Sequence, residues 1–536
     1  MRRVVFALLL VLSTSALAQL REAPYDLILR NGRIVDGTGS PWFRGDIAIR
    51  GDTIARIAPS IEGAAQRTID ASNLVIAPGF IDVHTHAGRT IFTVPTADNY
   101  IRQGVTTIME GADGAGPAIG GSTPVPIKPW LDKLESLPKS INIGSFVGQN
   151  AVRAAVIGLD NRPASAEEIA RMRALVRQDM KDGAFGLSTG LFYVPGAFTP
   201  QAEVVELQKE VAPYRGLHTS HMRDEADHVV DSVRETIAIG ELAGVPTQVS
   251  HHKIIGRANW GRSAETLKLI DEARARGVDA TLDQYPYTAS ATSIEAGMLP
   301  QWVQEGGRAK MLARLKDPEQ RSKIRAAILS SGRGAEPRNV GISACSWDMS
   351  LAGKNLLEVT QQRGMEPTPE NAAETVLWLV ERGGCGGIYH SIGEEDVLRI
   401  MAHPAVMIAS DGGVIPFGFG VPHPRSYGTF ARVLGVYVRE KGVIRLEEAI
   451  RKMTSFPAAK LQLMDRGLLR AGMKADIAVF DAARVKDMAT FDKPHQYAAG
   501  FEYVLVNGQV VYEGGQMTAA RPGRVIYGAG KPSPAR

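Results

Sequence analysis

The chain of 536 residues has only two cysteines, Cys345 and Cys385. Two thiols are too few for a disulfide scaffold or a multi-cysteine metal site, and their spacing leaves open whether they pair. Beyond the N-terminal segment, no apolar run is long enough to cross a membrane as a helix of about 20 residues. The formal net charge is only +4, so neither nucleic acid nor an anionic membrane surface is an expected partner.

Residues 1–18 have the layout of a secretory signal peptide. Arg2 and Arg3 precede the apolar stretch 4–12, and small residues lead up to Ala18. This apolar stretch is too short for a membrane anchor, and small residues of this kind are typical of a cleavage site. We predict cleavage after Ala18 and export of a soluble chain to the periplasm or, alternatively, outside the cell.

Short strands broken by glycine turns characterise both ends of the mature chain. Residues 19–78 contain strand-like runs separated by turns such as Asn31-Gly32, and residues 465–536 repeat this style. We predict that these two segments form the N-terminal and C-terminal halves of one small β-sandwich.

Residues 79–464 alternate apolar strand-like runs with helical patterns. This alternation is typical of an α/β fold and predicts a TIM-like (β/α)8 barrel of parallel strands. The candidate strands end near His86, Glu110, Phe146, Gly190, His221, His251, Tyr285 and Asp411. Helices are expected at 165–181, 231–243 and 263–276. The stretch at about 290–405 is too long for a simple connection, so we expect a helical insertion over the site.

His84 and His86 are the most informative residues, because side chains two apart in a strand share one face and can converge on one metal ion. Alone, the pair is equally well explained as two polar residues in a turn. His221, His251 and Asp411 also fall at predicted strand ends, where barrel enzymes carry their catalytic groups. Histidines with a carboxylate suit zinc or a similar divalent ion, so the pattern predicts a metallohydrolase.

This constellation resembles the amidohydrolase superfamily and is most similar to the D-aminoacylases, the N-acyl-D-amino-acid deacylases. The matching motifs cover nearly the whole mature chain: Asn31 to Gly39, His84 to His86, Gly186 to Tyr193, His221 to Glu225, Ser250 to Lys253, Asp283 to Tyr287, Ser410 to Gly412, His423 to Phe430 and Arg521 to Gly523.

The resemblance implies hydrolysis of a linear amide, most simply an N-acyl-D-amino acid, with one or two Zn²⁺ ions or another divalent ion such as Mn²⁺. Asp411 would be the general base and acid that moves the proton from water to the leaving amine. The residues implied to bind the substrate carboxylate are Tyr193, Arg223, Lys253, Tyr285 and Arg425. For Arg223 the competing interpretation is a surface salt bridge with Asp224 or Glu225.

The chain departs from the family at two places. D-aminoacylases have a cysteine ligand after the second strand, and here ungapped register puts Asp113 at that position, with Glu110 at the strand end. Either carboxylate would replace the thiolate as a bridge, and such a change favours harder ions. After the third strand Gln149 stands where the family commonly has histidine, so any role there is neutral hydrogen bonding.

Three alternatives to the deacylase remain at this point. One is a D-peptidase or dipeptidase, and another is a hydantoinase-like amidohydrolase. The second needs a carboxylated lysine at the fourth strand, whereas Lys181 lies before that strand. A more remote alternative is a non-catalytic periplasmic binding protein, which would be expected to have lost its metal ligands. The deacylase and each of these alternatives are compatible with assembly into a homo-oligomer.

Overall fold

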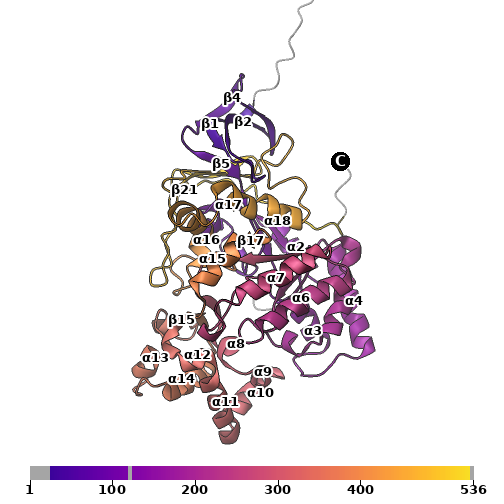
Figure 1. Cartoon of the computed structure of the whole chain (residues 1–536), viewed down its shortest axis with the longest axis vertical. Coiled ribbons are helices and arrows are strands. Elements are labelled where there is room, and N and C mark those ends of the chain that lie inside the picture. Colours follow the sequence, from indigo (N-terminus) through magenta and orange to yellow (C-terminus); the bar gives the residue numbers. More distant parts are fainter. Residues whose placement is uncertain (1–24, 119–122, 532–536) are drawn as a thin grey trace, which may run out of the picture.

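The computed structural model describes residues 25–118 and 123–531, so the predicted signal peptide, residues 1–18, lies outside the described residues. A β-domain lies at the top of Figure 1, a barrel in the middle and a mainly helical insertion at the bottom. No helix within the described ranges has both the length and the apolar character needed to cross a membrane.

The middle part is a closed barrel of eight parallel strand positions. Its strands are β6 (Phe80–Asp82), β7 (Val105–Glu110), β8 (Asn142–Ser145) with its continuation β9 (Val147–Gly148), β10 (Gly186–Gly190), β11 (Leu217–His221), β12 (Thr247–Val249), β13 (Ala280–Gln284) and β17 (Val406–Ile408). The ring closes between β17 and β6, where Asp411 N donates to His84 O at 2.9 Å and His86 N donates to Gly412 O at 2.7 Å. The predicted barrel fold is confirmed.

Helices surround the barrel, and their ends follow local sequence signals. In α4 (Ala166–Lys181) the Ser165 side chain and Glu168 form a reciprocal capping box, which satisfies amide groups that the first turn leaves unpaired. The other helices outside the insertion are α1 (Asp98–Ile101), α2 (Lys128–Glu135), α3 (Gln149–Val156), α5 (Gln201–Gln208), α6 (Val229–Ala243), α7 (Ser263–Ala275), α15 (Glu394–Ala402), α16 (Arg425–Arg432), α17 (Leu446–Met453) and α18 (Ser455–Lys460). Those expected at 165–181, 231–243 and 263–276 are therefore present as α4, α6 and α7.

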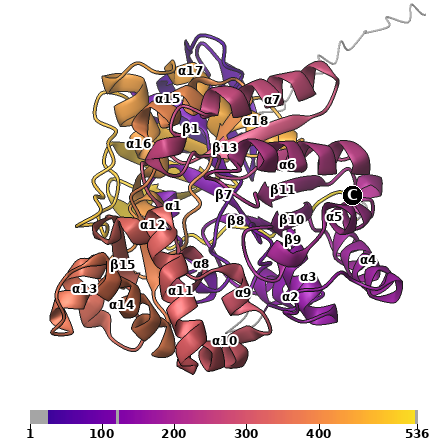
Figure 2. The ribbon, with the colours of Figure 1, turned by 60° about the horizontal axis from the view of Figure 1, so that its bottom comes forward.

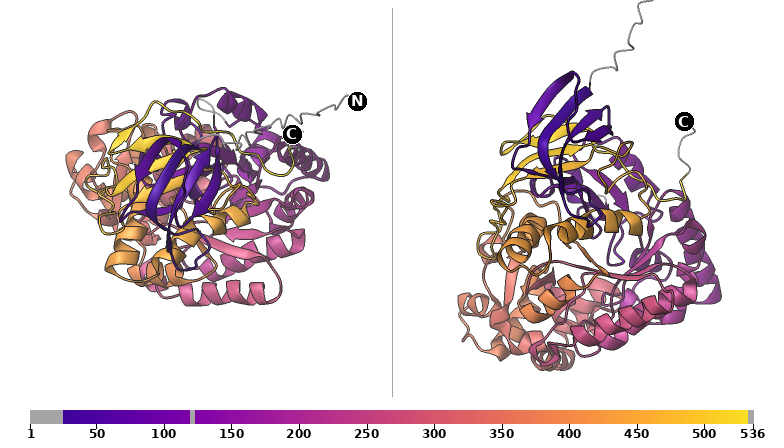
Figure 3. Two further views of the ribbon diagram at one scale, coloured as in Figure 1. Left: turned by 90° about the horizontal axis from the view of Figure 1, so that it is seen from above. Right: turned by 45° about the horizontal axis from the view of Figure 1, so that its top comes forward.

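The two chain ends meet in one nine-stranded sheet, seen from above in Figure 3. Its strands are β1 (Tyr25–Ile34), β2 (Phe43–Arg50), β3 (Thr53–Ala58), β4 (Ala65–Asp70), β5 (Val75–Pro78), β18 (Ile477–Phe480), β19 (Phe501–Val506), β20 (Gln509–Glu513) and β21 (Gln516–Met517). The junction is the antiparallel pairing of β5 with β18, which places Pro78 opposite Ile477. Because β5 leads directly into β6, this domain lies at the N-terminal ends of the barrel strands.

The insertion between β13 and α15 lies at the end of the barrel away from the β-domain, as Figure 1 and Figure 2 show. Its helices are α8 (Ile294–Met298), α9 (Gln301–Gln304), α10 (Gly307–Lys316), α11 (Pro318–Ser330), α12 (Gly332–Ala335), α13 (Leu356–Gln362) and α14 (Pro369–Glu381). It also contains an antiparallel sheet that the sequence did not predict, β14 (Ser290–Ser293), β16 (Gly386–Tyr389) and β15 (Val340–Ala344). Cys345 and Cys385 form a disulfide inside a separate apolar core.

Candidate metal centre and active site

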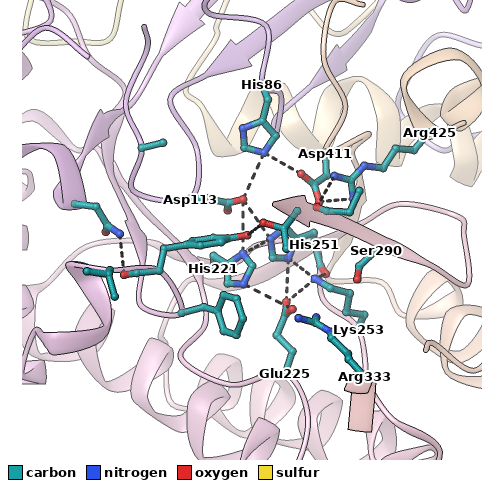
Figure 4. Close-up of a pocket in the computed structure, with 17 residues that line it drawn as sticks. His86, Asp113, His221, Glu225, His251, Lys253, Ser290, Arg333, Asp411 and Arg425 are labelled. Atoms are coloured by element: carbon teal, nitrogen blue, oxygen red, sulfur yellow. Dashed lines mark hydrogen bonds and ion pairs between the residues drawn. The ribbon is translucent and has the colours of Figure 1, made fainter. Parts of the chain in front are cut away.

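The predicted site residues converge at the C-terminal ends of the barrel strands (Figure 4). His221 is the last residue of β11, and His251 and Asp411 follow β12 and β17. His84 and His86 lie beyond the end of β6, which stops at Asp82, so the pair occupies the strand-to-loop turn and not the strand itself. A parallel bridge between Thr85 and Gly412 keeps this turn against the last strand.

Two groups of side chains can each hold a metal ion, and they share one residue. The first consists of His84, His86, Asp113 and Asp411, and the second of Asp113, His221 and His251. Within each group the ligand atoms all lie within 4.8 Å of one another. Asp113 Oδ2 is 3.5 Å from His86 Nε2 and 3.4 Å from His251 Nε2. A carboxylate in this position has the geometry of a bridge between two ions.

Glu110 belongs to neither group. Its buried carboxylate lies behind the turn that carries the histidines, where it accepts hydrogen bonds from Ala87 N at 2.5 Å and Thr85 Oγ1 at 3.3 Å. Burial raises the pKa of this carboxyl, although His86 opposes the increase. Of the two carboxylates left open by the sequence, only Asp113 reaches both groups, and Glu110 supports the backbone of the turn.

Three residues of the two groups have left-handed backbone conformations. The φ angles are +54° for Asp113, +35° for His251 and +51° for Asp411. This region is unfavourable for residues with a side chain, and such strain concentrates at functional sites. In each case the strained residue directs an ionisable side chain towards the same centre.

The donor set fits a metal ion because two of its buried ligand atoms have no hydrogen-bond partner. His84 Nε2 and Asp113 Oδ1, 3.3 Å apart, are in this state among the described residues. An unsatisfied buried polar atom costs about 1–3 kcal/mol, so convergent atoms of this kind indicate a missing ligand. Imidazole and carboxylate donors suit zinc and related divalent ions.

Charged neighbours orient the two groups. Arg425 Nη1 lies 2.7 Å from Asp411 Oδ2. Burial alone would raise the pKa of Asp411, but Arg425 and the nearby histidines hold that pKa well below its usual range. Lys253 Nζ donates to Glu225 Oε1 and lies 2.8 Å from His251 Nδ1. Glu225 Oε1 also lies 3.2 Å from His251 Nδ1, so this carboxylate can accept the outer N–H of the ring and leave Nε2 free for a metal ion.

A cavity of about 400 Å³ opens beside the two groups. From the predicted substrate-binding set, Tyr193, Lys253 and Arg425 line it. Tyr285 is not among the lining residues, because its ring lies beneath the Arg425 guanidinium at 4.8 Å, and its buried hydroxyl has no hydrogen-bond partner. The insertion closes one side of the cavity with Thr292, Arg333 and neighbouring residues.

The Arg223 side chain is engaged by other residues of the protein. It makes a two-point ion pair with Glu235 of α6, at 3.0 and 2.8 Å, and donates to the carbonyls of Ala197 and Thr199. It is absent from the lining of the cavity. None of these contacts places it at a substrate carboxylate, so that role stays a prediction, and its ion-pair partner is neither Asp224 nor Glu225.

Glu225 and Asp283 lie within the matching motifs but were not predicted as site residues, and neither was Arg333. Glu225 lies in the His221 motif, and Asp283 Oδ1 accepts from His251 N at 2.8 Å. Both stand in family motifs close to ligands, which was an available signal. Arg333 gave no such signal, because it lies in the insertion, outside every recognised motif.

The barrel, the histidines at its strand ends and the shared carboxylate define the class of barrel metallohydrolases. Residues 360–512 match the family model described as "Amidohydrolase family". D-aminoacylase from Alcaligenes xylosoxydans xylosoxydans is 37% identical over 526 residues, covering 95% of this chain and 99% of that protein. N-acyl-D-glutamate deacylase from the same organism is 35% identical, with 94% and 96% covered.

Among solved structures, N-acyl-D-glutamate deacylase from Bordetella bronchiseptica, complexed with zinc and a phosphonate inhibitor, has a TM-score of 0.80. It is 34% identical, and the match covers 94% of this chain and 100% of that one. The chain therefore belongs to the D-aminoacylase family of amidohydrolases, and the resemblance drawn from its motifs is confirmed.

Proposed function

We propose that this protein is a metal-dependent deacylase that hydrolyses N-acyl-D-amino acids to D-amino acids and carboxylates. The observation that carries the proposal is the Asp113 carboxylate, which is shared by two potential metal groups beside a cavity that contains Asp411. The D-aminoacylase and the N-acyl-D-glutamate deacylase, both similar over nearly their full length, support the substrate class.

The metal ligands proposed are His84, His86, Asp113, His221, His251 and Asp411. Zinc is the preferred ion, because the donors are those zinc favours and the related Bordetella bronchiseptica structure is complexed with zinc. When bound, such an ion lowers the pKa of a water molecule and polarises a carbonyl.

Asp411 is the proposed proton carrier. Its carboxylate lies at the junction of the first metal group and the cavity, 2.9 Å from His86 Nε2. The Arg425 guanidinium keeps it ionised, so it can accept the proton of the attacking water and deliver it to the leaving amine. Lys253 and Tyr193, which line the same cavity, are placed to hold the substrate carboxylate.

The hydantoinase-like alternative is not favoured, because β10 contains no lysine and Lys181 ends α4 on the opposite side of the connection. The D-peptidase alternative shares the amide chemistry but lacks a relative of comparable similarity among those described above. A binding protein without catalysis is disfavoured because both potential metal groups have retained their ligands.

We infer that the chain is exported. The charged and then apolar N-terminal residues 1–18 support a signal peptide, and the Cys345–Cys385 disulfide suits an oxidising compartment such as the periplasm. N-terminal sequencing of the secreted protein tests this, with Gln19 expected as the first residue.

A hydrolysis screen tests the proposed function, with purified protein whose metal content has been measured. The substrates are N-acetyl-D-amino acids, their L forms, D-dipeptides and hydantoins. Preferential cleavage of the N-acetyl-D compounds, lost on chelation and restored by Zn²⁺, is expected. Equal rates on D and L forms would defeat the stereospecific part, and turnover of hydantoins alone would overturn the proposal.

A further inference from the structure

Arg333 stands where the catalytic cavity meets a second, larger cavity. The second cavity, of about 690 Å³, runs between the barrel and the insertion. Phe192, Glu225 and Arg333 line both, so the two spaces adjoin at these side chains. Figure 4 shows Arg333 beside Lys253 and Glu225, on the side of the cavity away from His86. A substrate group that extends from the catalytic cavity towards the second cavity would therefore pass Arg333.

The charge of Arg333 is available to a ligand. The other two basic residues of the catalytic cavity, Lys253 and Arg425, are paired with Glu225 and Asp411. Arg333 forms no ion pair with any acidic residue in the described part of the chain and only donates to the carbonyl of Gly297, at 3.0 Å. A half-buried guanidinium with one neutral acceptor retains donors for a carboxylate.

The guanidinium is also held in position. It lies over the ring of Tyr389 at 4.5 Å and near the ring of Phe192 at 5.9 Å, and the bond to Gly297 fixes its orientation. Stacking of this kind reduces the conformational entropy that an arginine loses on binding. The Arg333 guanidinium is therefore preorganised on the wall contributed by the insertion.

We propose that Arg333 is a specificity-determining residue that binds a second carboxylate of the substrate. This inference rests on the proposed function and narrows its substrate class to N-acyl-D-amino acids that carry two carboxylates. The first carboxylate meets Lys253 and Tyr193, and the second meets Arg333. The extra carboxylate belongs either to an acidic side chain, as in D-glutamate, or to a dicarboxylic acyl group.

The second carboxylate must end close to Arg333. Beyond it, the second cavity is lined by Asp224, Asp227 and Glu336, whose charges repel an anion that reaches farther. A short acidic chain therefore fits this arrangement better than a long one.

The test compares isosteric substrates that differ only in charge. N-acetyl-D-glutamate and N-acetyl-D-glutamine form the side-chain pair, and N-succinyl-D-leucine and its succinamoyl analogue form the acyl pair. For zinc-loaded wild type, we expect kcat/KM to favour the acidic member of one pair by about 10- to 100-fold, the range of one charge-assisted bond. Arg333→Gln should reduce this ratio to about threefold or less, mainly through KM, and Arg333→Lys should restore part of it.

Arg257→Gln is the matched control, because Arg257 lines only the second cavity and its loss changes net charge equally. Its ratio should equal that of wild type. A ratio unchanged in Arg333→Gln, or reduced equally by both variants, would overturn the inference. Because each ratio compares two substrates on the same variant, a general loss of activity affects both values and does not change the ratio.

Calorimetric binding of the same pairs separates this inference from the proposed function. If wild type cleaves none of the four compounds but binds one acidic member in an Arg333-dependent way, the deacylase proposal fails and the proposed role of Arg333 in binding a carboxylate is supported. If it cleaves them without preferring either acidic member in rate or binding, the deacylase proposal stands and the role of Arg333 is refuted.

Discussion

The carboxylate of Asp113 lies 3.4 Å from the Nε2 atom of His251, although 138 positions of chain with four barrel strands separate the two residues. The same carboxylate lies 3.5 Å from His86 Nε2. Asp113 therefore connects the turn after β6 with the loop after β12, and a change at this one residue should affect both potential metal groups.

Removal of the shared carboxylate should reduce the metal content. Asp113→Ala is expected to lower bound zinc by about half or more, because a bridging ligand is lost from both groups. Glu110→Gln is the matched control, since Glu110 lies outside both groups and should leave the metal content near that of wild type. Elemental analysis of both purified variants measures the bound zinc. Loss of zinc in Glu110→Gln but not in Asp113→Ala would instead identify Glu110 as the shared ligand.

Asp411→Asn should abolish turnover with little loss of metal. The amide retains an oxygen ligand but cannot accept the proton of water, so kcat is expected to fall about 10³-fold. Steady-state kinetics and metal analysis are performed on the same preparation. Near-normal kcat in a fully loaded variant would exclude Asp411 as the proton carrier.

Arg223→Ala should affect stability and leave substrate binding unchanged. The Arg223–Glu235 pair and two carbonyl bonds join β11, α6 and the loop at Ala197, and their loss is expected to cost about 1–2 kcal/mol. Chemical unfolding of Arg223→Ala, Glu235→Ala and the double variant measures the coupling. A large increase in KM without loss of stability would support the predicted contact with the substrate.

Opening the Cys345–Cys385 disulfide should destabilise the insertion. The cysteines are separated by 40 positions, for which loop-closure entropy gives a loss of about 3–4 kcal/mol. The Cys345→Ser/Cys385→Ser variant should unfold at lower temperature than oxidised wild type, and reduced wild type should match it. Equal melting temperatures for oxidised and reduced wild type would contradict a stabilising role.

Asp179 should make stability depend on pH. Its carboxyl is buried on α4 and accepts from Ile127 N at 2.8 Å. Burial raises its pKa from the ordinary 3.8 to about 7. The folded state therefore holds a proton that the unfolded chain releases, so the contribution of Asp179 to stability is greatest below pH 4 and is lost as the pH rises to about 7.

Asp179→Asn removes this titration while keeping an acceptor for Ile127. The variant should gain stability relative to wild type between pH 4 and pH 7, by at most about 4 kcal/mol, and the gain should level off above this range. Unfolding by denaturant at several pH values measures the difference. A difference independent of pH would show that Asp179 does not titrate in this way.

Much of the site was predictable because its ionisable residues lie at or just after the ends of strands. His84, His86, His221, His251 and Asp411 are short-range signals: each follows an apolar run, and a parallel barrel brings all such ends to one face. The barrel itself follows from the alternation of strands and helices, which is also a local property. The exact residue at which a strand ends depends on its neighbours in the folded barrel. The histidine pair was therefore predicted to lie in a strand, although it lies in the turn that follows.

The family, the barrel and the residue types of the candidate metal centre follow from the sequence, because motifs and periodicity are local. The folded chain was needed to show which carboxylate reaches both histidine groups, which acid pairs with Arg223, and that Arg333 from the insertion meets the cavity. Those outcomes depend on distances between segments far apart in the chain. A carboxylate shifted by three residues, as from Asp113 to Glu110, keeps its chemistry but faces a different part of the molecule.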